Sequence, residues 1–302
     1  MAWIHSVLDR LEDSANWGYS PQSQPASEPV ALAALTLAAH GRRVAAQRAA
    51  SWLVAAQIAS GSVGISATES APQWPTGLAV LAWKAVTNGQ ASRDLNESQE
   101  QSHIPTVRAL NWLLASSGEK IERSAALKHD STLQGWSWVD GTHSWLEPTA
   151  FAVLALKACG LERHPRTREG VRLIVDRLLP SGGCNYGNTE VFGQTLRPHM
   201  LPSGLALTAL AGESDPSGRL DRTLTYVADA VGPETTAASL GWAVIGLAAH
   251  GRLPNGFERW LETAAERTTQ RGASLPRLTL LTLAALGSET PFFMLTRPRG
   301  VS

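Results

Sequence analysis

Two carboxylic acid residues stand directly before prolines at the start of apolar segments. They are Glu28, in Glu28-Pro29, and Glu147, in Trp145-Leu146-Glu147-Pro148-Thr149-Ala150. A carboxyl group buried among aromatic side chains can keep its proton, because burial disfavours the charged form. A carboxylate at the start of a helix can instead satisfy free backbone amides and the positive end of the helix dipole. The repeated Glu-Pro arrangement favours this capping role, and the sequence leaves both roles of Glu147 open.

Aromatic residues and glycines gather in the segments that lead into the apolar runs. The chain has 11 Trp against 3 Tyr and 5 Phe. Large π faces can stabilise a cation, or they can fill the centre of a helical protein, and the sequence does not separate these two roles. The candidates for ligand binding are Trp17, Trp74, Trp136, Trp138, Trp145 and Tyr186.

Six apolar runs predict helices that are buried on every side. Most of them open with a proline, which is preorganised for a first helical turn, and each ends near a glycine, as is typical of a helix C-terminus. The runs begin at Glu28, Trp74, Glu147, Leu201, Ala237 and Leu275, and the glycines are Gly41, Gly89, Gly160, Gly212, Gly251 and Gly287.

Amphipathic segments alternate with these runs. Apolar residues recur in them at a spacing of three to four, with charged residues on the opposite face, which predicts half-exposed helices. The segments span residues 3–12, 44–58, 105–116, 165–179, 219–231 and 256–269.

This alternation predicts an all-α fold, an α/α toroid of six helical hairpins. Apolar helices form its inner ring and amphipathic helices its outer ring. In an open solenoid, the rival arrangement, both helices of each hairpin would keep a solvent face, whereas here the second helix keeps none. We expect a single domain over residues 1–302, with a frayed tail at about 296–302.

Composition excludes several classes of protein. The 26 Lys and Arg balance 26 Asp and Glu, so no electrostatic footprint indicates a nucleic acid or an anionic membrane as partner. No apolar run is long enough to span a bilayer, and the first residues are unlike a signal peptide. The two cysteines, Cys159 and Cys184, indicate a reducing compartment, so we expect a cytoplasmic protein. Phosphate-binding and hydrolase motifs are absent, and we expect no cofactor.

The loops and the Glu147 segment resemble the terpenoid cyclase and protein prenyltransferase superfamily, which includes squalene–hopene cyclase. Gln134-Gly135-Trp136 is similar to a degenerate form of the family's glutamine–tryptophan repeat. The segment Trp145 to Ala150 is similar to the Asp-x-Asp-Asp-Thr-Ala motif of class II cyclases, in which the middle aspartate protonates a double bond or an epoxide. Glu147 takes the place of that acid, whereas Trp145 and Pro148 replace its two neighbouring aspartates.

The resemblance implies an acid-initiated cyclisation or isomerisation of an apolar isoprenoid in an aromatic-lined cavity, with Glu147 as the catalytic acid. Class II triterpene cyclases have two helical barrels, so a single barrel implies a smaller substrate, a partner subunit or homo-oligomer, or lost activity. A non-catalytic toroid that binds an apolar ligand or a protein partner is the first alternative.

A zinc prenyltransferase β-subunit-like protein, which would need an α partner, is the second alternative. Members of that branch of the superfamily hold zinc with an aspartate, a cysteine and a histidine at inner-helix starts. The corresponding loops here offer Asp140, His143, Cys184 and His199, but the family's Asp-x-Cys pair does not occur. We favour Cys184 as a small buried residue and the histidines as ordinary loop residues, and expect no zinc.

Overall fold

The computed structural model describes residues 2–14, 16–88, 98–123 and 127–296. The frayed tail predicted at about 296–302 therefore lies outside the described residues, apart from Thr296.

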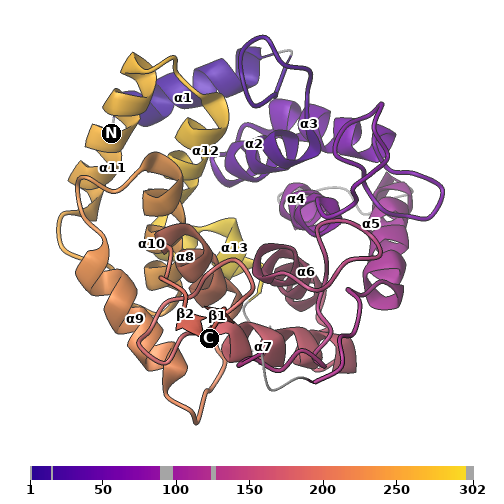
Figure 1. The fold of residues 1–302 in the computed structure, drawn as a ribbon. Coiled ribbons are helices and arrows are strands. Elements are labelled where there is room, and N and C mark those ends of the chain that lie inside the picture. Colours follow the sequence, from indigo (N-terminus) through magenta and orange to yellow (C-terminus); the bar gives the residue numbers. More distant parts are fainter. Residues whose placement is uncertain (1, 15, 89–97, 124–126, 297–302) are drawn as a thin grey trace.

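Twelve helices of the described chain form two concentric rings, as Figure 1 shows. The outer ring contains α1 (Ala2–Asp13), α3 (Arg43–Ala55), α5 (Ser98–Ala115), α7 (Pro165–Arg177), α9 (Arg219–Ala230) and α11 (Phe257–Gln270). The inner ring contains α2 (Ser27–Ala39), α4 (Thr76–Asn88), α6 (Leu146–Ala158), α8 (Met200–Ala209), α10 (Ala237–Ala249) and α12 (Leu275–Ala284). Each inner helix packs on the next, and α12 packs back on α2. The predicted α/α toroid is confirmed, and the closed ring excludes the open solenoid.

The inner helices are buried on all sides because their sequences leave no polar face. In α2, for example, every residue from Pro29 to Leu37 is buried. Glycines with a positive φ follow the inner helices, as at Gly41 (72°) and Gly160 (76°), where a side chain would strain the left-handed backbone. None of the described helices is both long and apolar enough to cross a membrane.

Short elements complete the described fold. The 3-10 helix η1 (Gly287–Glu289) and the helix α13 (Pro291–Met294) follow the inner ring. The strands β1 (Glu190–Val191) and β2 (Gln194–Thr195) form an antiparallel hairpin between α7 and α8, with Glu190 opposite Thr195.

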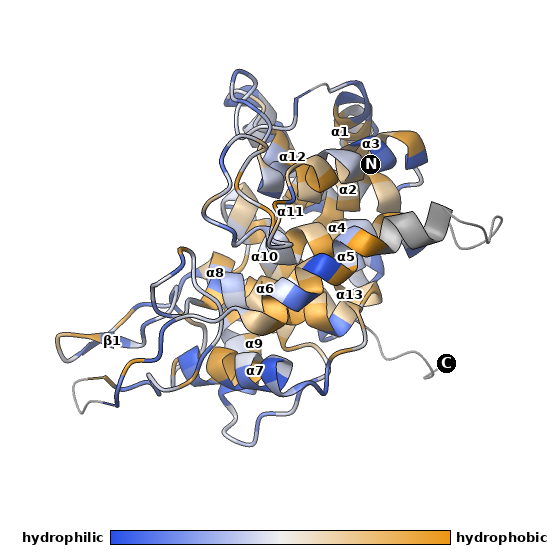
Figure 2. Cartoon of the chain, turned by 90° about the vertical axis from the view of Figure 1, so that its right-hand side faces the viewer, coloured by the Kyte–Doolittle hydropathy of each residue, from blue (hydrophilic) through white to orange (hydrophobic). Residues whose placement is uncertain are grey.

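The longest connections lead from an outer helix to the next inner helix, so they gather at one end of the toroid, which we call the mouth. Figure 2 shows these loops projecting beyond the apolar helices on one side. They comprise residues 14–26, 56–75, 116–145 and 178–199, whereas residues 231–236 and 271–274 make short connections in the last two repeats.

A hydroxyl group at the start of an inner helix anchors the loop before it in three repeats. In each case the hydroxyl oxygen accepts a hydrogen bond from a buried backbone amide of the loop, at 2.9 Å. The pairs are Thr76 with Val63, Thr149 with Trp136, and Ser203 with Cys184. The Pro-Thr and Pro-Ser steps of the sequence therefore supply a proline for the helix start and an acceptor for the loop.

An arginine on each outer helix binds backbone carbonyl groups near the end of the preceding outer helix. The guanidinium group presents five N–H donors in a rigid fork, so one side chain can satisfy several carbonyls. The bonds run from Arg48 to Glu12 and Ser14, from Arg108 to Ile58 and Ala59, from Arg166 to Ser116, from Arg219 to Asp176 and Leu178, from Arg267 to Pro233 and Thr235, and from Arg10 to Ala273. The Arg10 bond joins the first repeat to the last.

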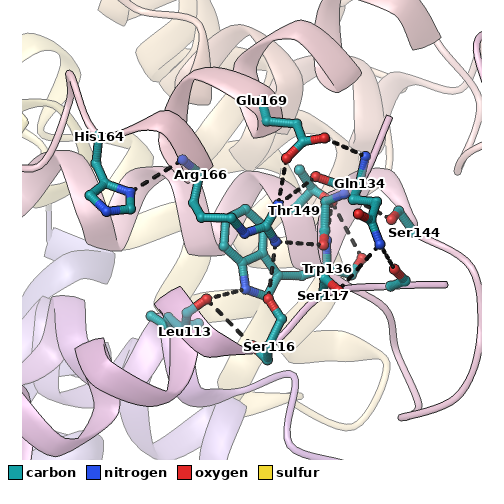
Figure 3. Close-up of polar contacts among 12 residues, drawn as sticks. Leu113, Ser116, Ser117, Gln134, Trp136, Ser144, Thr149, His164, Arg166 and Glu169 are labelled. Atoms are coloured by element: carbon teal, nitrogen blue, oxygen red, sulfur yellow. Dashed lines mark hydrogen bonds and ion pairs between the residues drawn. The ribbon is translucent and has the colours of Figure 1, made fainter. Parts of the chain in front are cut away.

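Arg166 makes the most extensive of these contacts, as Figure 3 shows. It donates to the carbonyls of Gln134, Ser116 and Gly135 at 2.9, 3.0 and 3.2 Å and to the Glu169 carboxylate at 2.9 Å. Its guanidinium also lies over the Trp136 ring, 4.5 Å from the centroid. This one side chain therefore fixes the loop that leads to Glu147.

We predict that Arg166→Ala lowers the free energy of unfolding by about 2–4 kcal/mol, because several loop carbonyls lose a charged donor. Urea unfolding followed by circular dichroism measures the change. Arg172→Ala, on the exposed face of the same helix, is the matched control and should change stability by less than about 0.5 kcal/mol. Equal unfolding midpoints for the two variants would contradict the anchoring role.

Candidate functional site

Three inner helices present comparable positions at the mouth. Glu28 and Glu147 lie in the first turns of α2 and α6, directly before Pro29 and Pro148, and Trp74 stands directly before Pro75, two residues ahead of α4. Because α4 packs against both α2 and α6, Trp74 leads into the helix between the two that bear the carboxyl groups. We call Tyr19, Glu28, Trp74, Glu147 and Tyr186 the mouth cluster.

The two carboxyl groups of the mouth cluster have different environments. Tyr19 donates a hydrogen bond from its hydroxyl to Oε2 of Glu28 at 2.5 Å. Glu147 has no hydrogen-bond partner among the described residues. Burial raises the pKa of Glu28, and the Tyr19 bond opposes this rise. Burial, and then the negative charge of Glu28, raise the pKa of Glu147 to about 7.

This asymmetry bears on where a proton sits within the pair. Two carboxylates in one buried site repel each other, which favours a single shared proton over a range of pH. The Tyr19 hydrogen bond favours the charged form of Glu28, and Glu147 has no such bond, so this contact favours the proton on Glu147. Both glutamates lie in the first turn of their helix, where the helix dipole favours a negative charge, but neither side chain accepts a hydrogen bond from a backbone amide in the described part of the chain.

Loop groups lie close to Glu147. The Leu146 amide donates to the Tyr186 carbonyl at 3.0 Å, which holds this loop against the start of α6. The pKa of the Cys184 thiol rises to about 12 and that of Tyr186 rises too, in both cases by burial first and then by the Glu147 charge. Tyr19 is 53% exposed and Tyr186 38%, so water reaches the phenol side of the cluster.

A chain of aromatic rings fills the centre of the toroid below the mouth. Phe151 lies one helical turn after Glu147 on α6, on the same face of the helix. Its ring centroid is 6.1 Å from that of Trp74 and 5.7 Å from that of Trp242, and Trp242 lies 5.0 Å from Phe292 of α13. Phe151, Trp242 and Phe292 are at most 5% exposed.

The sequence did not single out these three aromatic residues. They lie in uniformly apolar segments, which carry no periodic signal to show the side facing the axis. Gly77 of α4 packs so closely that an added Cβ would lie 2.8 Å from the Phe151 carbonyl carbon. A glycine inside a predicted inner helix is the one signal in the sequence that indicates such close packing of two inner helices.

The aromatic residues that the sequence predicts to bind a ligand fall into two groups. Trp74 and Trp138 form an edge-to-face pair at the mouth, with centroids 4.7 Å apart, and both line, together with Trp136, a cavity of about 20 Å³. Trp145 packs on the His143 ring at 4.6 Å.

Trp17 and Trp136 belong to the wall between the rings instead. Each is buried, and each donates its indole N–H to an outer-helix carbonyl, that of Leu11 or Leu113. Each also lies under a guanidinium, that of Arg48 or Arg166. These contacts give the two tryptophans a structural role, and Trp136 also lines the small cavity beside Trp74 and Trp138. Their role in binding a ligand stays a prediction.

The structure does not gather the four zinc candidates. No group of three or more His, Cys, Asp and Glu in the described ranges could hold a metal ion. Asp140 and His199 are exposed, whereas Cys184 is fully buried with a raised pKa, which disfavours the thiolate that zinc requires. Cys184 takes the loop position that Trp136 holds in the preceding repeat, where its amide bonds a helix-start hydroxyl.

Comparison with known proteins supports the fold. No protein-family model matches the chain, and no curated protein matches it. A solved structure of a mutant of Rex8A from Paenibacillus barcinonensis, complexed with xylose, is similar over 96% of this chain and 92% of its own, with TM-score 0.59 and 10% identity. A protein from Actinoplanes is similar over 96% of this chain and 98% of its own, with TM-score 0.54 and 14% identity. These similarities bear on the fold alone.

We predict that Glu147→Gln makes the folded protein more resistant to alkaline pH. The folded-state pKa of Glu147 is about 7, above the ordinary value of 4.5. Between these pKa values the folded chain binds more protons than the unfolded chain. The stability that the wild type owes to protonated Glu147 is therefore fully present below pH 4.5 and is lost as the pH rises through 7. Glutamine carries no charge and avoids the loss.

Urea unfolding of both proteins from pH 4.5 to 8.5 measures this effect. The variant should gain about 1–3 kcal/mol over the wild type at high pH and nothing at pH 4.5. Glu258→Gln, which removes an exposed carboxyl group from α11, controls for the loss of one charge. A difference between wild type and Glu147→Gln that is constant with pH would contradict the buried-acid assignment.

Proposed function

We propose that the mouth cluster cleaves a glycosidic bond by general acid–base catalysis, with Glu147 as the acid and Glu28 as the base. The observation that carries this proposal is the asymmetric carboxyl pair, in which Tyr19 donates to Glu28 and Glu147 lacks a hydrogen-bond partner. Two carboxyl groups, one protonated and one charged, are what hydrolysis of a glycoside requires.

The chemistry follows from these two roles. Glu147 gives its proton to the leaving oxygen as the bond from that oxygen to the anomeric carbon breaks. A water molecule attacks the same carbon, and its proton passes to the Glu28 carboxylate. Release of the two products and exchange of the protons with solvent restore the pair.

The spacing of the helices favours a single displacement by water. Packed helices lie about 8–10 Å apart, and α4 stands between the two helices that bear the carboxyl groups. Inverting enzymes hold their two carboxyl groups about 6.5–9.5 Å apart, and retaining enzymes about 5–5.5 Å. With a helix between the two that bear the carboxyl groups we expect the wider separation, and therefore inversion at the anomeric carbon.

A saccharide is the substrate class that fits the mouth best. The exposed phenol rings of Tyr19 and Tyr186 offer flat apolar faces with polar edges, which suit the mixed surface of a sugar. The xylose complex of the fold neighbour Rex8A is compatible with this choice.

Acid-initiated isoprenoid chemistry is a second candidate. The Phe151 ring one turn below Glu147, in contact with Trp74 and Trp242, offers π faces that would stabilise a carbocation. The same rings fill the centre below the acid, however, and the cavity beside Trp74 and Trp138 measures about 20 Å³, close to the size of one water molecule. Saccharide hydrolysis, which suits a shallow site open to water, therefore ranks ahead of isoprenoid chemistry, which needs a deep cavity that excludes water.

We predict that Glu147→Gln lowers kcat by about 10²- to 10⁴-fold on oligosaccharides, because a poor leaving group needs a proton. On an aryl glycoside such as a 4-nitrophenyl xyloside the loss should be much smaller, since nitrophenolate leaves without protonation. In the wild type kcat should fall as the pH rises above about 7, following loss of the Glu147 proton. A screen of xylo-, gluco- and manno-oligosaccharides, with product configuration read by NMR, identifies the substrate.

Glu28→Gln should lower turnover on both kinds of leaving group, and Glu258→Gln on neither. An equal loss on the two leaving groups in Glu147→Gln would contradict the acid role. Turnover of a linear isoprenoid alkene, with none of any saccharide, would favour the second candidate. Binding of either compound without turnover would indicate a non-catalytic toroid.

Tyr19→Phe tests the assignment of the charge within the pair. The variant removes the hydrogen bond that favours ionised Glu28, so the pKa of Glu28 should rise. We therefore expect the acidic limb of the pH–activity profile to move to higher pH, with the folded structure retained. An unmoved acidic limb would contradict the role of Glu28 as base.

A further inference from the structure

A cavity of about 490 Å³ opens between α10, α11 and α12, at the mouth end of the last two repeats. Three arginines line it: Arg267 from α11, Arg271 directly after the end of α11, and Arg277 from α12. No residue of the mouth cluster lines it, so it is a separate feature of the fold.

The cavity lies where the last two repeats lack the long loops of the others. Loop residues Val63, Trp136 and Cys184 pack on helix-start hydroxyls in repeats two to four. The corresponding connections before α10 and α12 comprise only residues 231–236 and 271–274. After the proline of α12, moreover, Arg277 stands where those three repeats have a threonine or serine.

The charge around the cavity is mostly positive and only partly neutralised. Arg267 donates to the carbonyls of Pro233 and Thr235 and pairs with Glu234 at 3.3 Å, although the Glu234 side chain is 92% exposed. The side chains of Arg271 and Arg277 have no hydrogen-bond or ion-pair partner in the described part of the chain. Arg267, in the last turn of α11, and Arg271, its C-cap residue, lie four residues apart, a spacing at which like charges on a helix repel.

Backbone amides add to the positive electrostatic potential of the cavity. Helices α10 and α12 both begin at the cavity, which Thr236, Ala237, Ala238 and Ser274 help to line. Neither N-cap residue, Thr236 or Ser274, accepts a side-chain hydrogen bond from the first turn of its helix. The positive ends of two helix dipoles therefore act together with the three guanidinium groups.

We propose that this cavity binds a small molecule through a phosphate group, which Arg271 and Arg277 contact from two sides. Guanidinium forks match phosphate oxygens, and free helix amides supply further donors. The volume lies within the range of small-molecule sites and exceeds that of a phosphate ion, which leaves room for an organic remainder. A bound phosphate would also relieve the repulsion between Arg267 and Arg271.

Isothermal titration calorimetry with inorganic pyrophosphate, at ionic strength held constant with KCl, tests the site. We expect one equivalent to bind to the wild type, and at least about 10-fold weaker binding in Arg271→Gln and in Arg277→Gln. Without pyrophosphate these variants should melt close to the wild type, since neither side chain has a hydrogen-bond or ion-pair partner among the described residues. Pyrophosphate should raise the melting temperature of the wild type more than that of these two variants.

Arg259→Gln is the matched control, because it removes an equal charge from an exposed position of α11 that does not line the cavity. It should bind pyrophosphate as the wild type does, and so should Glu147→Gln, since the site is independent of the mouth cluster. Equal weakening in Arg259→Gln and Arg271→Gln would reduce the effect to general charge attraction and overturn the proposal. So would the absence of pyrophosphate binding at constant ionic strength.

Discussion

The bond between an arginine and the carbonyl groups of the preceding repeat is the interaction on which the toroid depends. The inner helices have no polar face, so they can stabilise the core but cannot satisfy the backbone of the loops that cross above it. Six guanidinium groups, one on each outer helix, supply those donors, and Arg10 does so between the first and last repeats. These bonds are partly exposed to solvent, and they help to determine where each loop enters its inner helix. The mouth is therefore an ordered surface although most of it is loop.

The carboxyl pair is a consequence of this order and acts against stability. A proline fixes the start of α2 and of α6, and the residue before it stands at the mouth in both helices. A helix cap would accept hydrogen bonds, whereas Glu147 finds none among the described residues and has a raised pKa. A protein selected for stability alone would carry glutamine or an apolar residue at this position, as α8 carries Leu201 before its proline. Retaining two coupled acids there suits a site that moves protons, since perturbed carboxyl groups concentrate at functional sites.

The sequence predicted the architecture well because the relevant signal is local. Periodicity separated inner from outer helices, and prolines and glycines marked their ends within a few residues of the structure. The site was predicted only in part, because its geometry depends on ring closure. From the sequence alone, Glu28 is interpreted as a second helix cap, because nothing in it shows that α2, α4 and α6 lie side by side. The sequence also does not show in which direction the rings of Trp17 and Trp136 point from their loops. Phe151, Trp242 and Phe292 were missed because a uniformly apolar helix gives no sign of which side faces the axis. Terpenoid cyclase-like activity therefore remains a proposal, whereas the toroid is confirmed.

Loop length alone accounts for the division of the molecule into two sides. Long connections in repeats one to four bring Tyr19, Trp138 and Tyr186 to the mouth, and in repeats two to four a backbone amide of the connection bonds the hydroxyl group at the helix start. Short connections in repeats five and six leave the starts of α10 and α12 uncovered, with Arg277 in place of the hydroxyl. An uncovered helix start carries free amides and a partial positive charge, to which the three arginines add. The same toroid therefore presents carboxyl groups at the starts of α2 and α6, where its loops are long, and a cavity lined by arginines at the starts of α10 and α12, where they are short. Loop length can thus vary the charge of the mouth without any change in the ring of helices.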